Sequence, residues 1–178
     1  YQQFSKARRR MHLAITPPVD PLKCAVAKHE PPRCGLTRIE LNRCAVVGVS
    51  DGMGVGSGVI VSRDGIVLTA SHVVTSPNRR SRNESATITM ANGRQFSATV
   101  LGKDRDSDAA MLRINDLPPD GRGFPFAEMG RTSESKVGEY CFAMGHPGGY
   151  RPDREAPVRI GRLLSIGNRT VVSDCAIL

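Results

Sequence analysis

The stretch GSGVIVSRDGIVLTASHVV, residues 56–74, is the most informative part of the chain for its fold. Two short runs of β-branched and aliphatic residues flank the turn sequence RDG (63–65), so this stretch predicts a β-hairpin. His72 follows the second run among small residues, which allow an imidazole to lie against the backbone in one rotamer. A histidine after a strand is by itself more often structural, so His72 becomes a candidate base only with a suitable partner.

Short apolar runs closed by turn signals continue from about residue 39 to the C-terminus. Most are rich in β-branched residues, and Asn92-Gly93 between two of them is a strong hairpin signal. No long amphipathic helix pattern is present. We therefore expect an antiparallel all-β barrel or sandwich. The runs are 45–49, 58–61, 66–70, 86–90, 96–101, 109–114, 140–145, 158–166 and 171–178.

Residues 1–38 have a different composition from the rest of the chain. They contain five prolines with basic residues between them and show no sustained periodicity. This composition predicts an irregular, Pro-rich N-terminal extension or linker. The chain has no run of eighteen apolar residues, so we expect no transmembrane segment.

The net charge of +8 raises the question of nucleic acid as a partner. The basic residues are scattered, however, with tight clusters only at Arg8–Arg10 and at Arg79, Arg80 and Arg82. Aromatic residues make up 4% of the chain and Trp is absent, so stacking platforms for single strands are scarce. We expect no specific nucleic-acid partner. Binding through the basic N-terminal arm, the alternative, predicts an affinity that falls steeply with salt.

Five cysteines leave at least one without an internal disulfide partner. The spacing of Cys24, His29 and Cys34 copies the last three ligands of a zinc knuckle, but Pro21 stands where the first cysteine belongs. A disulfide or plain buried thiols are favoured over zinc here. We expect no metal site, and the redox compartment stays open.

The segment DRDSDAAMLRI (104–114) offers a partner for the histidine. Asp108 stands at the mouth of an apolar run, where it could be buried and accept a hydrogen bond from an imidazole Nδ1–H. Such a bond fixes the tautomer and stabilises the imidazolium. Asp104 and Asp106 compete for this role, but both precede the run and are more readily turn or exposed residues.

Five blocks in fixed order resemble the trypsin-like serine peptidases of the HtrA (DegP-like) kind. The resemblance runs from about Cys44 to Leu178 and implies a trypsin-like double β-barrel. Residues 39–123 would form a complete first barrel and residues 124–178 an incomplete start of the second. The blocks are LTASHVV (68–74), SDAAMLRI (107–114), VGEYCFAMGHPGG (137–149), VRIGRLLSI (158–166) and SDCAIL (173–178).

The resemblance implies peptide-bond hydrolysis through an acyl-enzyme, with His72 as general base and Asp108 as its orienting carboxylate. It implies a polypeptide substrate, no cofactor, and a lean toward an extracytoplasmic (periplasmic or secreted) location. In the family a Gly-x-Ser-Gly-Gly block follows the segment that SDCAIL resembles. We therefore expect the nucleophile about four residues beyond Leu178, and this fragment alone to be inactive. Oligomeric state stays open.

Other residues of the chain offer weaker chemistry. Ser57 lies between glycines but leads into a strand, whereas a nucleophile elbow leads into a helix. We expect Ser71 to point away from the His72 ring, and His146 of the GHPGG turn to be structural.

The alternative function is a non-catalytic trypsin-like module that binds peptide or protein, with the arginines at 79, 80 and 82 contacting an acidic partner.

Overall fold

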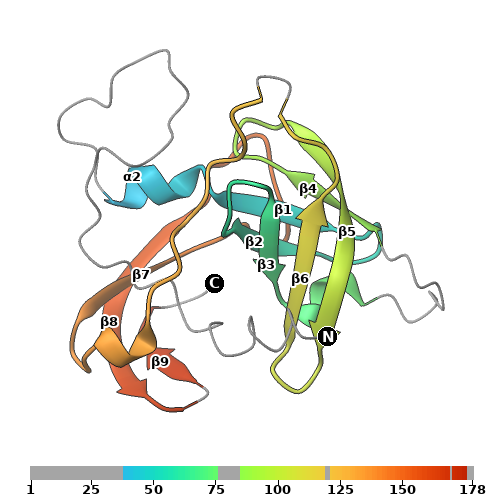
Figure 1. The fold of residues 1–178 in the computed structure, drawn as a ribbon. Coiled ribbons are helices and arrows are strands. Elements are labelled where there is room, and N and C mark those ends of the chain that lie inside the picture. The colour runs from blue at the N-terminus through green and yellow to red at the C-terminus, as the bar shows by residue number, and fades with distance from the viewer. Residues whose placement is uncertain (1–37, 76–84, 119–120, 169, 176–178) are drawn as a thin grey trace.

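The computed structural model of the chain describes residues 38–75, 85–118, 121–168 and 170–175. Six strands close into a barrel, and three more form a second sheet (Figure 1). The expected all-β class is confirmed, and the complete barrel beside a partial second sheet agrees with a trypsin-like double barrel. The extension expected for residues 1–38 lies outside the described residues except for its last residue, and the arginine cluster at 79–82 lies outside them entirely.

The barrel is antiparallel throughout and closes on itself. Its spatial order is β1-β2-β3-β6-β5-β4, and β4 pairs back onto β1, so no barrel strand has a free edge. Both predicted turns are present, because Gly65 (φ +84°) and Gly93 (φ +81°) take the left-handed conformation that such turns require. The strands are β1 Val46–Ser50, β2 Val55–Ile60, β3 Ile66–Thr69, β4 Ser85–Thr89, β5 Gln95–Asp104 and β6 Ala109–Ile114.

Alternating residues of these strands fill the barrel with aliphatic side chains. Val47, Ile60 and Leu112 are completely buried there. Phe124, which follows the last barrel strand, closes the core by packing edge-on against Phe96, with 5.2 Å between ring centroids. Burying a side chain of this size contributes about 1.5–3 kcal/mol, so this core is the main stabilising element of the barrel.

The second sheet consists of β7 Tyr140–Met144, β8 Val158–Ile166 and β9 Val171–Ser173, in the order β7-β8-β9. The strand expected at 171–178 is wrong at residues 174–175, because β9 ends at Ser173, and residues 176–178 lie outside the described part of the chain. The next residue, Asp174, turns its carboxylate back and accepts a hydrogen bond from the Arg162 amide at 2.5 Å. Where β9 ends, the Arg162 amide on β8 is therefore bonded to the Asp174 side chain and not to a main-chain carbonyl.

Helices within the described residues are short. The helix α2, Arg38–Arg43, was not predicted, since six residues are too few to show a hydrophobic period. Glu40 in its first turn and Arg43 in its last suit the helix dipole. Two 3₁₀ turns, η2 Ser71–Val74 and η3 Thr132–Glu134, complete the set. No described helix has the length and apolar character needed to cross a bilayer.

The GHPGG turn after β7 joins the second sheet to the barrel. The Ser57 hydroxyl on β2 accepts a hydrogen bond from the His146 amide at 2.7 Å. Tyr150 packs so closely on Gly48 of β1 that a Cβ there would lie 2.6 Å from the Tyr150 Cβ. These contacts attach the start of the second sheet to the wall of the first barrel. The division expected between residues 123 and 124 stays a prediction.

Candidate active site

His72 is presented by the 3₁₀ turn η2, directly after β3. Its neighbours Val73 and Val74 are buried in the barrel core, so they anchor the turn and leave the His72 side chain facing outward. Gly56 on β2 permits this packing, because a Cβ there would lie 2.6 Å from a methyl carbon of Val73. The glycine-rich β2 therefore determines how deeply the histidine turn sits against the barrel.

Asp108 ends the turn between β5 and β6. Its φ of +47° is the only positive value at a non-glycine position among the described residues. Aspartate is one of the few side chains that tolerate this conformation. The Asp108 carbonyl accepts a hydrogen bond from the Ser71 amide at 3.2 Å. That main-chain contact brings the β5–β6 turn against η2 and places the carboxylate beside the imidazole.

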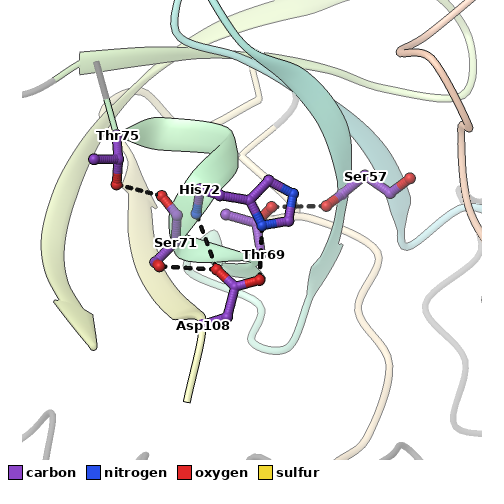
Figure 2. Close-up of polar contacts among 6 residues, drawn as sticks. All are labelled: Ser57, Thr69, Ser71, His72, Thr75 and Asp108. Carbon is purple, nitrogen blue, oxygen red and sulfur yellow. Dashed lines mark hydrogen bonds and ion pairs between the residues drawn. The ribbon is translucent and has the colours of Figure 1, made fainter. Parts of the chain in front are cut away.

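The Asp108 carboxylate receives three contacts from two consecutive residues (Figure 2). The Nδ1 of His72 lies 2.7 Å from Oδ2, and the His72 amide donates to Oδ1 at 3.0 Å. The Ser71 hydroxyl also donates to Oδ1, at 2.9 Å. An ionised carboxylate only accepts, so the Nδ1 carries the proton and Nε2 of the neutral ring is left as an acceptor.

The same contacts determine the charge of Asp108. Partial burial by itself raises the pKa of Asp108, but hydrogen bonds from the His72 amide, the His72 ring and the Ser71 hydroxyl together outweigh it. The pKa of Asp108 therefore lies below its ordinary value, and the group is ionised at neutral pH. The expected burial of Asp108 is wrong for the described residues, because 51% of its side chain is exposed, as is 73% of His72.

The two competing aspartates make local contacts instead. Oδ1 of Asp104 accepts a hydrogen bond from the Asp106 amide at 3.1 Å, which closes the turn after β5. Asp106 is an exposed turn residue as expected, but the same expectation is wrong for Asp104, which is the last residue of β5 and is partly buried. The structure thus brings only Asp108, of the three, to the His72 ring.

Ser71 is the site residue that sequence reasoning missed. Its side chain is 4% exposed and donates to Asp108, away from the His72 ring as expected, but the contact with the carboxylate was not foreseen. Thr75 strengthens the arrangement by donating its hydroxyl to the Ser71 carbonyl at 2.5 Å. A hydroxyl residue directly before the histidine was the only signal in the sequence.

Ser57 and His146 form a separate pair at the barrel wall. Besides holding the His146 amide, Ser57 accepts a hydrogen bond from the Thr69 hydroxyl through its carbonyl, at 2.7 Å. His146 is 2% exposed and its ring packs against Tyr150, with 5.4 Å between centroids. Burial and, secondarily, the Arg154 charge lower the pKa of His146, which keeps the ring neutral. Neither residue hydrogen-bonds to His72 or Asp108.

The described residues contain no group of three or more His, Cys, Asp or Glu side chains arranged to hold a metal ion. The zinc-knuckle-like residues Cys24, His29 and Cys34 lie outside the described part of the chain.

The family model of the trypsin-like peptidase domain matches residues 56–177, which include η2, Asp108 and the second sheet. The chain belongs to the trypsin-like peptidase family. Three similar curated proteins carry names of the HtrA group, so the expected resemblance to HtrA (DegP-like) peptidases is confirmed.

The putative serine protease HhoA of Synechocystis is 35% identical over 96 residues, covering 54% of this chain and 22% of that protein. The putative protease Do-like 14 of Arabidopsis thaliana is 34% identical over 102 residues, covering 56% and 23%. A probable periplasmic serine endoprotease, DegP-like, of Hahella chejuensis is 30% identical over 125 residues, covering 70% and 24%. The match with this trypsin-like domain thus spans less than a quarter of each of these relatives.

Proposed function

We propose that this trypsin-like domain supplies the general base, His72, and its orienting carboxylate, Asp108, to a serine endopeptidase. The observation that carries the proposal is the 2.7 Å contact between Nδ1 of His72 and Oδ2 of Asp108. It leaves Nε2 as the only basic atom of the ring, on a side chain that is largely exposed. A base in this state accepts a proton from a hydroxyl brought to Nε2.

In the proposed reaction, Nε2 of His72 takes the proton of a serine hydroxyl as its oxygen attacks the peptide carbonyl. The imidazolium that forms is stabilised by the Asp108 carboxylate, which stays ionised because its pKa is low. His72 then gives the proton to the departing amine, leaving an acyl-enzyme. Water releases the acyl group by the same path, with His72 again acting as the base.

The nucleophile comes, in this proposal, from the family's Gly-x-Ser-Gly-Gly block. Within the described residues no Ser, Thr or Cys side chain is hydrogen-bonded to Nε2 of His72. We therefore propose that the 178-residue polypeptide alone does not hydrolyse peptides. Removing the nucleophile from a complete triad lowers turnover by about six orders of magnitude.

The proposed substrate is a polypeptide, bound in an extended conformation as an added strand between the barrels. We further propose an extracytoplasmic location. It is supported by the names of relatives such as the probable periplasmic endoprotease of Hahella chejuensis.

The test is active-site labelling of the protein encoded by the whole gene with a fluorophosphonate probe. We expect labelling of the full-length protein, loss of labelling in His72→Ala, and retention in Ser57→Ala, which removes the glycine-flanked hydroxyl. A folded full-length protein that the probe does not label would contradict the peptidase proposal and favour the non-catalytic binding module. Labelling that disappears in Ser57→Ala would instead move the nucleophile into the first barrel.

A further inference from the structure

Two cysteines far apart in sequence meet in the second sheet. Cys141 lies on β7 and Cys175 follows the end of β9, so the intervening strand β8 separates their elements in the sheet order (Figure 1). Their sulfur atoms are nevertheless 3.6 Å apart. The Cys175 sulfur also lies 3.8 Å from the Cys141 carbonyl oxygen. Each thiol is therefore the close neighbour of the other.

Gly161 is the reason that they meet. It sits on β8 directly opposite Cys141, and it has no side chain to fill the space above the strand. A Cβ at Gly161 would lie 2.8 Å from the Cys175 nitrogen and 2.9 Å from its sulfur. The chain after β9 thus crosses over β8 at its glycine. A register shift between Leu163 and Ser165 accompanies this crossing.

We propose that Cys141 and Cys175 are a reversible dithiol–disulfide pair that fastens β7 to the chain leaving β9. A disulfide bond is about 2.05 Å long, so the sulfur atoms need to approach by about 1.5 Å, which small side-chain and local backbone adjustments supply. Cys175 is 9% exposed and Cys141 is partly exposed, so an oxidant reaches Cys141 first. The proposal does not depend on His72 or Asp108 and goes beyond the proposed function.

The oxidant is a small-molecule disulfide. The Cys141 thiolate attacks it, forming a mixed disulfide and releasing one thiolate of the oxidant. The Cys175 thiolate then attacks the Cys141 sulfur, the internal disulfide forms, and the second thiolate of the oxidant leaves. Two electrons pass to the oxidant, and the two protons lost by the cysteines end on its two thiols. Burial, followed by the neighbouring Cys175, raises the pKa of Cys141, so oxidation accelerates as the pH rises.

The internal bond closes a loop between positions 34 residues apart. Such a cross-link stabilises the folded chain mainly by restricting the unfolded one. Cys44 is a natural comparison, because it is exposed and forms no sulfur–sulfur contact within the described residues. Among the three cysteines that the structure describes, the geometry therefore favours the Cys141–Cys175 pairing.

The experiment equilibrates the intact 178-residue chain in a buffer of oxidised and reduced glutathione, blocks free thiols with iodoacetamide and digests with trypsin. Mass spectrometry then follows the linked peptides 137–154 and 170–178, which contain Cys141 and Cys175. We expect this pair to dominate in the folded chain and to lose its preference in concentrated guanidinium chloride. Oxidation should raise the melting temperature by about 5 °C or more.

Cys44→Ser should keep both effects, whereas Cys141→Ser and Cys175→Ser should each abolish them. The comparison of folded with denatured wild-type chain needs no variant, so it tests the proposed pairing even where a substitution weakens folding. Three outcomes would overturn the proposal: no 137–154/170–178 link, a link no more frequent in the folded chain than in the denatured one, or glutathione remaining on Cys141.

Discussion

Asp108 contacts His72 at two points. Its Oδ2 lies 2.7 Å from the ring Nδ1, and its Oδ1 accepts a hydrogen bond from the His72 main-chain amide at 3.0 Å. One carboxylate therefore holds both the imidazole ring and the backbone amide of the same residue. Rotation of the imidazole about its side-chain torsions breaks the first contact while the second holds the turn in place. A substitution that keeps an oxygen acceptor for the His72 amide should for this reason affect the ring without dismantling the barrel.

Asp108→Asn should leave the domain folded, because Asn also tolerates a positive φ and has nearly the same shape. The neutral amide does not hold the Nδ1–H tautomer. In the full-length protein we expect turnover of a peptide substrate to fall by about 10⁴. In the 178-residue chain, nitrogen NMR of His72 should show the proton leaving Nδ1. A variant with near-wild-type turnover would remove Asp108 from the mechanism.

Ser71→Ala should weaken the site without dismantling it, since the His72 amide still donates to Oδ1. Losing one donor raises the pKa of Asp108 toward its ordinary value, because fewer hydrogen bonds favour the charged form. Carboxyl-carbon NMR titration of the chain measures this shift. We expect about a tenfold loss of turnover in the full-length protein, in line with one hydrogen bond to a charged group.

Ser57→Ala is the matched control for Ser71→Ala, because it removes a hydroxyl that contacts His146 and not Asp108. The Asp108 titration should be unchanged in this variant. An identical shift in both variants would show a general loosening of the barrel, and no shift in Ser71→Ala would leave that serine with a packing role only.

Asp64 gives a pH dependence of stability with a definite sign. Its pKa is lowered chiefly by a hydrogen bond with the Ser62 side chain; burial opposes this effect, and the hydrogen bond and charge of Arg113 add to the lowering. A depressed folded-state pKa stabilises the fold above the unfolded value, near 3.8, and this contribution is lost as the pH falls through the folded-state pKa.

Guanidinium unfolding of the wild type and Asp64→Asn across this acid range measures that contribution. The variant should be less stable at neutral pH, and the two free energies of unfolding should converge as the pH is lowered. Curves that stay parallel at all pH values would show that Asp64 does not carry the linkage. The neutral-pH difference itself should be small, because both Asp64 and Arg113 are about half exposed.

Gly161→Ala should destabilise the second sheet. The added methyl group overlaps the Asp174 carboxylate and the Cys175 backbone, so the chain after β9 must move away from β8. We expect a loss of about 1–3 kcal/mol in the free energy of unfolding. Gly167→Ala is the matched control, because the nearest atom to its Cβ would be 3.4 Å away. Equal losses in the two variants would contradict the crossing at Gly161.

The strands and turns were predictable because they rest on local chemistry. β-branched runs favour extended backbone, and Asn92-Gly93 carries the conformational preference of a tight hairpin in its own side chains. Each of the nine expected runs overlaps one strand. The end of β9 was not predictable, because it depends on Asp174 reaching back to Arg162, a contact between residues twelve positions apart.

The pairing of His72 with Asp108 was predictable from the sequence, but the Ser71 hydrogen bond to Asp108 was not. The proposed roles of His72 and Asp108 follow from the family resemblance, whereas the Ser71 contact accompanies a positive φ at Asp108 that no residue type in DRDSD dictates. The thiol pair was hidden for a similar reason. Its proximity depends on a glycine of a third strand, and the sequence records no sign of that crossing.

The left-handed backbone at Asp108 also limits how this domain can change by descent. A gene copy released from selection for catalysis accepts Asn or Gly at this position with little loss of folding, since both adopt that conformation readily. Val or Ile strains the turn by about 1–2 kcal/mol, so such copies lose folding stability as well as the proposed carboxylate. Catalytically inactive copies that persist as folded proteins should therefore carry Asn or Gly at this position more often than Val or Ile.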